Sequence, residues 1–98
     1  MKLAIQLTSG VESEDAHTVK KLAEAALRQG HEVNIFVMDD GVHNLHALKI
    51  LIDRGAHIAV CAHNAHERSI VQVEGILFGG QPDWAEIVNQ ADRVVCFG

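Results

Sequence analysis

The chain has 98 residues, of which 48% are hydrophobic, and its 13 acidic and 8 basic side chains give a net charge of −5. This length predicts one domain over residues 1–98 with a thin core that favours association between copies, because a chain of this size buries only about 60 to 68% of its unfolded surface. The negative charge argues against nucleic acid and anionic membrane surfaces as partners, and no apolar run approaches the ~20 residues that span a bilayer.

The first third of the chain predicts a strand followed by a helix. Residues 2–8 are apolar and rich in strand formers, and Ser9-Gly10 ends this strand. From Asp15 onwards apolar residues recur at three- and four-residue spacing, with charged residues on the opposite side, which indicates an amphipathic helix. Gln29-Gly30 ends the helix, since glycine is common just past a helix C-terminus.

A second strand and a second helix are predicted next. Residues 33–38 form a run of strand formers that closes on the turn-forming triplet 39–41. The helix that follows ends at Arg54-Gly55 in the same way as the first helix. Its apolar stripe consists of Leu45, Leu48 and Ile52, with Leu51 as an optional fourth member.

A third strand is predicted at residues 56–62, and Asn64 is expected to cap a short helix that extends to Arg68. Residues 70–78 fit either a helix or an extended segment, because their apolar positions match both periods. This leaves the connection to the final part of the chain open.

The chain is predicted to end with a helix and a strand. Pro82 suits the first turn of a helix that carries Trp84, and residues 93–97 form the last strand. Alternating strands and helices, with strands that are apolar on both faces, are typical of a parallel sheet covered on two sides. We therefore expect an α/β fold, a three-layer α/β/α sandwich with a mainly parallel sheet of about five strands. Ligands of such sheets bind beyond the carboxyl ends of the strands, here residues 9–15, 39–45 and 61–68.

Cys61 is the first candidate for chemistry, because the third strand gives way to a loop there and His63 and His66 follow. A helix N-terminus and nearby imidazoles lower the pKa of a thiol, and the thiolate is the reactive form. The predicted catalytic set is therefore Cys61, His63 and His66. The alternative is a buried cysteine that packs as a small hydrophobic side chain.

Cys96 lies between Val95 and Phe97 in the predicted last strand, so we expect it in the core. A competing interpretation makes it a resolving or relay thiol close to Cys61. Two cysteines in separate apolar segments, in a chain without a recognisable export signal, predict reduced thiols and a cytoplasmic location.

Histidine is unusually frequent, with 7 residues, and a metal site is the first function to consider for them. His43, Cys61, His63 and His66 would be its ligands. Their spacing does not match a structural zinc motif, so no cofactor is expected to be required and the metal site stays an alternative. The same histidines could instead titrate with a thiolate, because imidazole changes charge near neutral pH.

Other reaction classes find little support in the sequence. Ser9-Gly10 lacks the lysine and the further glycines of a phosphate-binding loop. Asp39-Asp40 could bind Mg²⁺, but adjacent acids before a glycine are typical of a turn. No Ser-His-Asp order suggests a hydrolase.

The order and spacing of several segments resemble the DsrE/DsrF-like family, which includes sulfur-relay subunits of the TusD type. The matching segments are Lys2-Leu3-Ala4-Ile5, Val33-Asn34-Ile35-Phe36, Met38-Asp39-Asp40-Gly41-Val42, Ile58-Ala59-Val60-Cys61 and Ala91-Asp92-Arg93-Val94-Val95-Cys96-Phe97. They span nearly the whole chain, and each one is short.

The resemblance implies a sulfurtransferase or sulfur carrier subunit. In the sulfur-relay members a cysteine after the third strand carries a persulfide, and Cys61 is the matching position. The family also implies a homo-oligomer, a trimer or hexamer, with sulfur donor and acceptor proteins as partners. The segment 62–68 is richer in histidine than the family leads us to expect. The alternative function is therefore a non-catalytic oligomeric binding module that holds a metal or small ligand through Cys61 and nearby histidines.

Overall fold

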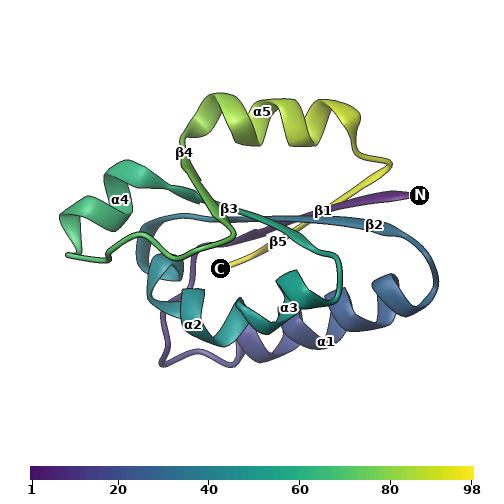
Figure 1. The fold of residues 1–98 in the computed structure, drawn as a ribbon, viewed down its shortest axis with the longest axis horizontal. Helices are drawn as coiled ribbons and strands as arrows, with labels where there is room; N and C mark the ends of the chain where they lie inside the picture. Colours follow the sequence, from purple (N-terminus) through teal and green to yellow (C-terminus); the bar gives the residue numbers. More distant parts are fainter.

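The computed structural model describes residues 1–98 and is built on one five-stranded sheet with the strand order β4-β3-β2-β1-β5 (Figure 1). The strands are β1 (Lys2–Leu7), β2 (Glu32–Val37), β3 (His57–Cys61), β4 (Ile76–Gly79) and β5 (Arg93–Phe97). Every pair of neighbouring strands is parallel. The predicted α/β class with a parallel sheet of five strands is therefore confirmed.

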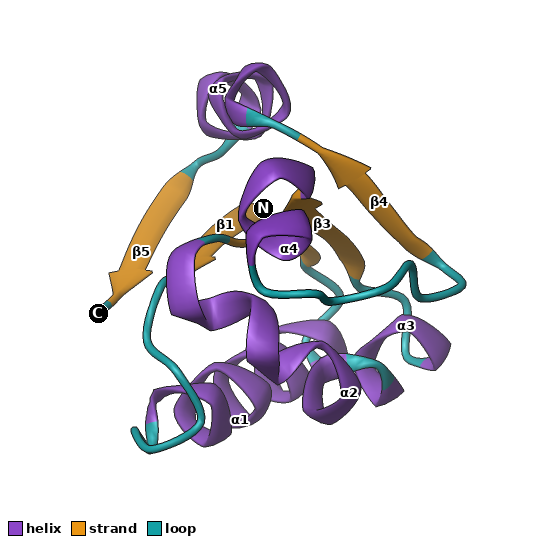
Figure 2. Cartoon of the chain, turned by 90° about the vertical axis from the view of Figure 1, so that its left-hand side faces the viewer, coloured by secondary structure: helices purple, strands orange, loops and turns teal.

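Helices cover the two faces of this sheet unequally. The helices are α1 (Asp15–Arg28), the 3₁₀ helix η1 (Asp39–Asn44), α2 (Leu45–Leu48), α3 (Ile50–Asp53), α4 (Ala62–Glu67) and α5 (Gln81–Gln90). Figure 1 shows α1, α2 and α3 on one side of the sheet and α5 on the other, and Figure 2 shows α5 alone on its side. None of these helices has the length and apolar character needed to cross a membrane.

The face toward α1 contains most of the core. Side chains alternate between the two faces of a strand, so Ile5, Ile35, Ile58 and Ile76 lie in one register row on this face. All four are buried and pack with the apolar stripe of α1 and with α2 and α3. Residues that fill a layer in this way supply most of the hydrophobic stabilisation of a small domain.

The face toward α5 has a much smaller core. Phe36, Ala59 and Cys61 form a cluster of three buried residues, and Met38 and Trp84 pack against it. The rings of Phe36 and Trp84 are stacked with their centroids 5.7 Å apart. Because α5 has no fully buried residue, Trp84 is the main anchor of this helix on the sheet.

The predicted second helix differs from the structure. The segment begins as the 3₁₀ helix η1 at residues 39–44, where we expected a turn at 39–41, and α2 and α3 are separated at Lys49. Val42 and Leu45 are three residues apart and both buried in the main core, a spacing that places them on one side of a helix with three residues per turn. The tighter winding is confined to η1, because α2 and α3 are α-helical.

The remaining boundaries shift by one or two residues. In the segment that we left open, Ile76–Gly79 forms β4, which pairs with β3 as the sheet edge. The predicted cap at Asn64 is wrong, because α4 begins at Ala62 with Cys61 in the N-cap position. The final helix and strand, Gln81–Gln90 and Arg93–Phe97, form where they were predicted.

Candidate functional site

Cys61 is the last residue of β3 and lies at the carboxyl edge of the sheet, directly before α4. Side chains alternate between the two faces of the sheet along β3. Val60 packs in the main core on the α1 side, so Ala59 and Cys61 face α5. Reacting groups of parallel α/β sheets collect at this edge. The backbone therefore places Cys61 where the sequence predicts it.

The surroundings of the Cys61 sulfur are mainly apolar. Cys61 is 8% exposed and belongs to the cluster with Phe36 and Ala59, against which Met38 and Trp84 pack. This cover limits the access of a reagent or a partner to the sulfur. A reaction at Cys61 therefore requires that Trp84 or Met38 move aside.

The two predicted catalytic histidines, His63 and His66, lie on α4 with exposed side chains. The Nε2 atom of His63 is 3.5 Å from Oε2 of Glu67, so the imidazole pairs with a carboxylate one turn along the helix. In this arrangement His63 interacts with Glu67, and both imidazoles are open to solvent.

Polar contacts tie α4 to η1 beside the Cys61 strand end. The Asp39 amide donates a hydrogen bond of 2.9 Å to Oδ1 of Asn64, and Nε of Arg68 donates one of 3.0 Å to Oδ1 of Asp40. The hydrogen bond to Asp40 raises the pKa of Arg68 above its ordinary value. The two acids that sequence reasoning considered for Mg²⁺ therefore join the loops after β2 and β3. The guanidinium of Arg68 is already paired with one of them.

The candidate metal ligands are not assembled into a site. His43 lies exposed in η1, on the segment that follows β2. No group of three or more histidine, cysteine, aspartate or glutamate side chains lies close enough together to hold a metal ion. The set His43, Cys61, His63 and His66 thus does not converge within one chain.

Cys96 is exposed, so its predicted place in the core is wrong. β5 is an edge strand, and only Val95 and Phe97 point to the main core, while Val94 and Cys96 face the side that α5 leaves open. Sequence reasoning missed this because the apolar run does not reveal the position of the strand in the sheet. Two strands, β1 and β2, separate β5 from β3, and Cys96 is in register with Ala59, two residues before Cys61, so the cysteines do not form a pair.

The loop after β1 is held by hydrogen bonds of Ser9. The Ser9 hydroxyl donates to the carboxylate of Asp15, and Nδ2 of Asn44 donates a 2.8 Å hydrogen bond to the Ser9 carbonyl oxygen. Asn44 is the one buried polar residue and was not singled out from the sequence. It lies in η1 between the buried residues Val42 and Leu45, and no local pattern marks a single polar residue as buried.

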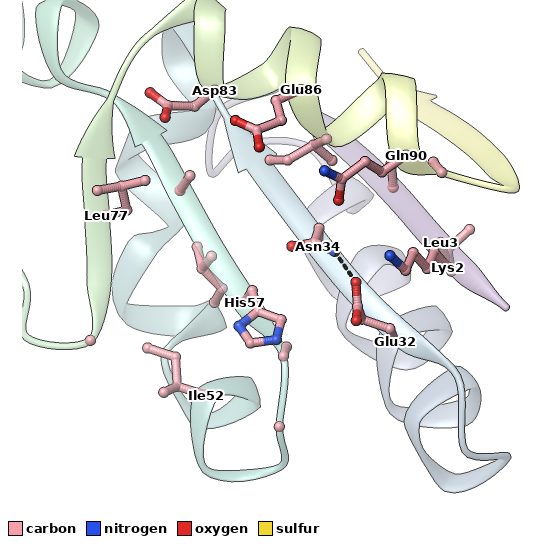
Figure 3. Close-up of a pocket in the computed structure, with 18 residues that line it drawn as sticks. Lys2, Leu3, Glu32, Asn34, Ile52, His57, Leu77, Asp83, Glu86 and Gln90 are labelled. Atoms are coloured by element: carbon pink, nitrogen blue, oxygen red, sulfur yellow. Dashed lines mark hydrogen bonds between the residues drawn. The ribbon is translucent and has the colours of Figure 1, made fainter.

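A groove of about 610 Å³ lies between α5 and the amino-terminal parts of the strands (Figure 3), and Cys61 is not among the residues that line it. Asp83, Glu86 and Gln90 line it from α5, and His57 lines it from the start of β3. Its volume is in the range of small-molecule sites. Sequence reasoning missed the groove because it exists only through the sparse packing of α5 on the sheet.

The two thiols should differ strongly in reactivity. We expect a thiol reagent added to the native chain to modify Cys96 roughly tenfold or more faster than Cys61, because only Cys96 is exposed. Stopped-flow labelling should show a fast and a slow phase. In a Cys96→Ser variant the fast phase alone should disappear, whereas equal rates for both thiols would contradict the burial of Cys61.

Comparisons with known proteins identify the family and the fold. The model of the DsrE/DsrF-like family matches residues 1–97. The sulfurtransferase TusD homolog of Pseudomonas aeruginosa is 31% identical, with 100% of this chain and 98% of that protein covered. Two solved structures share the fold. The YchN protein of E. coli has a TM-score of 0.81 at 20% identity, with 98% of this chain and 97% of that chain covered. The protein BT1422 of Bacteroides thetaiotaomicron has a TM-score of 0.75 at 14% identity, with 98% and 94% covered. This chain belongs to the DsrE/DsrF-like family.

Proposed function

We propose that this chain is a sulfur carrier subunit in which Cys61 accepts sulfane sulfur as a persulfide and passes it to a partner protein. The observation that carries the proposal is the position of Cys61 at the carboxyl edge of the sheet, in a chain of this family. A relative named as a sulfurtransferase, similar over the full length of both chains, supports it.

The chemistry needs only thiols and sulfane sulfur. The Cys61 thiolate attacks the outer sulfur of a donor persulfide, a new S–S bond forms, and the donor leaves as a thiolate. In the second step an acceptor thiolate attacks the outer sulfur on Cys61, and Cys61 leaves as a thiolate. Oxidation states balance across each exchange, so the proposal requires no metal or redox cofactor.

Access to Cys61 is coupled to partner binding in this proposal. The thiol lies under Met38 and Trp84, which are only half-buried and belong to the surface. A docking donor would displace them, and the exposed imidazoles of His63 and His66 would then lie at the contact to exchange the thiol proton. We place this exchange in the cytoplasm, where thiols stay reduced.

Association between copies is part of the proposal, as a homo-oligomer that forms a trimer or hexamer. The α5 side supports it, because Leu77 is 56% exposed, Val94 is 43% exposed and Val88 of α5 is also exposed. Apolar side chains left open on one side of a small domain are typical of contact surfaces.

The groove beneath α5 favours a second candidate function, a non-catalytic binding module for a small ligand. In that function the ligand would lie against the polar groups of α5 and His57, and Cys61 would serve only in packing. The metal-binding form of this alternative lacks a converging set of ligands within one chain.

Sulfur loading tests the proposal. A Cys96→Ser variant incubated with inorganic polysulfide, or with a cysteine desulfurase and cysteine, should gain the mass of one sulfur atom in intact mass spectrometry. A Cys61→Ser, Cys96→Ser double variant is the matched control and should gain nothing. No added sulfur in the first variant, or the same gain in both, would reject the carrier function.

A further inference from the structure

Two amide groups are directed at one sulfur atom on the α5 face of the sheet. Nε2 of Gln6, from β1, donates a 3.3 Å hydrogen bond to Sδ of Met38, and Nε2 of Gln81, at the start of α5, donates one of 3.5 Å to the same atom. A thioether is a weak acceptor. Gln6 is moreover a half-buried polar residue in a central strand, between Cys96 and Phe36 in register. Within the protein both amides therefore donate only to a weak acceptor, and the exposed Gln81 side chain is also open to water.

The point at which the amides meet lies beside Cys61. Val37 is the last residue of β2 and pairs with Val60 of β3, so the residues that follow in each chain segment, Met38 and Cys61, stand next in this register. On its other side the Met38 amide donates a 3.1 Å hydrogen bond to the Leu7 carbonyl oxygen of β1. Met38 is thus the neighbour of Cys61 across β2 and β3, which lie about 4.8 Å apart. Met38 also packs against the buried cluster that includes Cys61, on the same face of the sheet.

Gln81 reaches this point from the opposite side. Gly79 pairs with Cys61 in the ladder between β3 and β4, Gly80 is the N-cap of α5, and Gln81 is the first residue of the helix. The start of α5 is therefore placed next to the end of β3 by the strand pairing itself. Side chains from β1, β3, α5 and the residue that follows β2 meet around one position.

A persulfide would present a better acceptor at this position. It extends the Cys61 side chain by one S–S bond of about 2.05 Å and ends in a sulfur that is anionic at neutral pH. Hydrogen bonds to an ionised acceptor are stronger than those to a neutral one, and more so in apolar surroundings. Met38 is flexible and can give way. Arg68, the basic residue after α4, is already paired with Asp40.

We propose that Gln6 and Gln81 bind the outer, anionic sulfur of the Cys61 persulfide. When the chain is loaded, the two amides no longer donate to the Met38 thioether and donate hydrogen bonds to that sulfur instead. They stabilise the persulfide until an acceptor attacks it. This inference rests on the carrier function and names the residues that hold its cargo.

The pH dependence of persulfide reactivity tests the inference. The variants Gln6→Met, Gln81→Met and the double variant, each with Cys96→Ser, are loaded with inorganic polysulfide, freed of excess reagent and alkylated over a range of pH. Methionine keeps the length of glutamine and removes the N–H donors. We expect the midpoint of the reactivity profile to rise by about one pH unit for each amide removed, because each stabilises the anion.

Gln29→Met is the matched control, because Gln29 is an exposed glutamine at the end of α1, on the opposite side of the sheet from α5 (Figure 1). It should leave the midpoint unchanged, and thermal unfolding should confirm that all variants fold. Identical midpoints in loaded wild-type and double-variant chains would overturn the inference and leave the carrier function intact. Absence of any persulfide on Cys61 in the unaltered site would overturn both.

Discussion

Replacing Trp84 with alanine should increase the rate of Cys61 labelling by a thiol reagent roughly tenfold, because the indole is the largest side chain that packs against the buried cluster. The change also removes the stack with Phe36, whose ring centroid is 5.7 Å away. Since Trp84 is half-buried, we expect a loss of about 2 kcal/mol in the free energy of unfolding, below the cost at a fully buried site.

The measurement uses a Cys96→Ser background, so that Cys61 is the single reporting thiol. Labelling kinetics give the access rate, and urea unfolding gives the stability. Val88→Ala is the matched control, because Val88 is an exposed residue one turn further along the same helix. An unchanged labelling rate in Trp84→Ala would show that the indole does not limit access to the thiol.

Gly41→Ala should destabilise the fold by about 3 kcal/mol or prevent folding at physiological temperature. A methyl group at Gly41 would collide with the carbonyl group of Leu7, whose carbon would be 2.9 Å from the new Cβ. Both partners are backbone, at the end of β1 and the start of η1, so neither can rotate away. Chemical denaturation monitored by circular dichroism measures the effect.

Gly30→Asn is the control for this prediction. Gly30 has a φ of +84°, a conformation that asparagine tolerates, and its added Cβ would meet nothing within 4 Å. We expect a change within about 1 kcal/mol there. A Gly41→Ala variant as stable as Gly30→Asn would show that β1 and η1 are not packed as closely as the structure has them.

Most elements of the fold were predictable from local patterns, because strands and long helices have distinct apolar periods. The segment after β2 was the exception. We expected a turn at residues 39–41 and an α-helix from Leu45, whereas a 3₁₀ helix already begins at Asp39 and the α-helical part is divided at Lys49. The turn-forming residues 39–41 are compatible with both a turn and a 3₁₀ helix, so the local pattern did not distinguish them.

The candidate site was predictable only in part. The position of Cys61 at a strand end follows from the order of the elements. The burial of its side chain depends on contacts between segments that are distant in the sequence. Met38 follows β2, Trp84 and Gln81 belong to α5, and no local pattern shows that they meet. The exposure of Cys96 likewise depends on strand order, which sequence periodicity does not report.

The unequal covering of the sheet has a consequence for how this protein can diverge. The layer under α1, α2 and α3 holds most of the buried residues, so substitutions beneath α5 should lower the free energy of unfolding less. Descendants of the chain can therefore vary the residues around Cys61 and the groove and still fold. New specificities in such a lineage should arise by exchanging side chains on that one side.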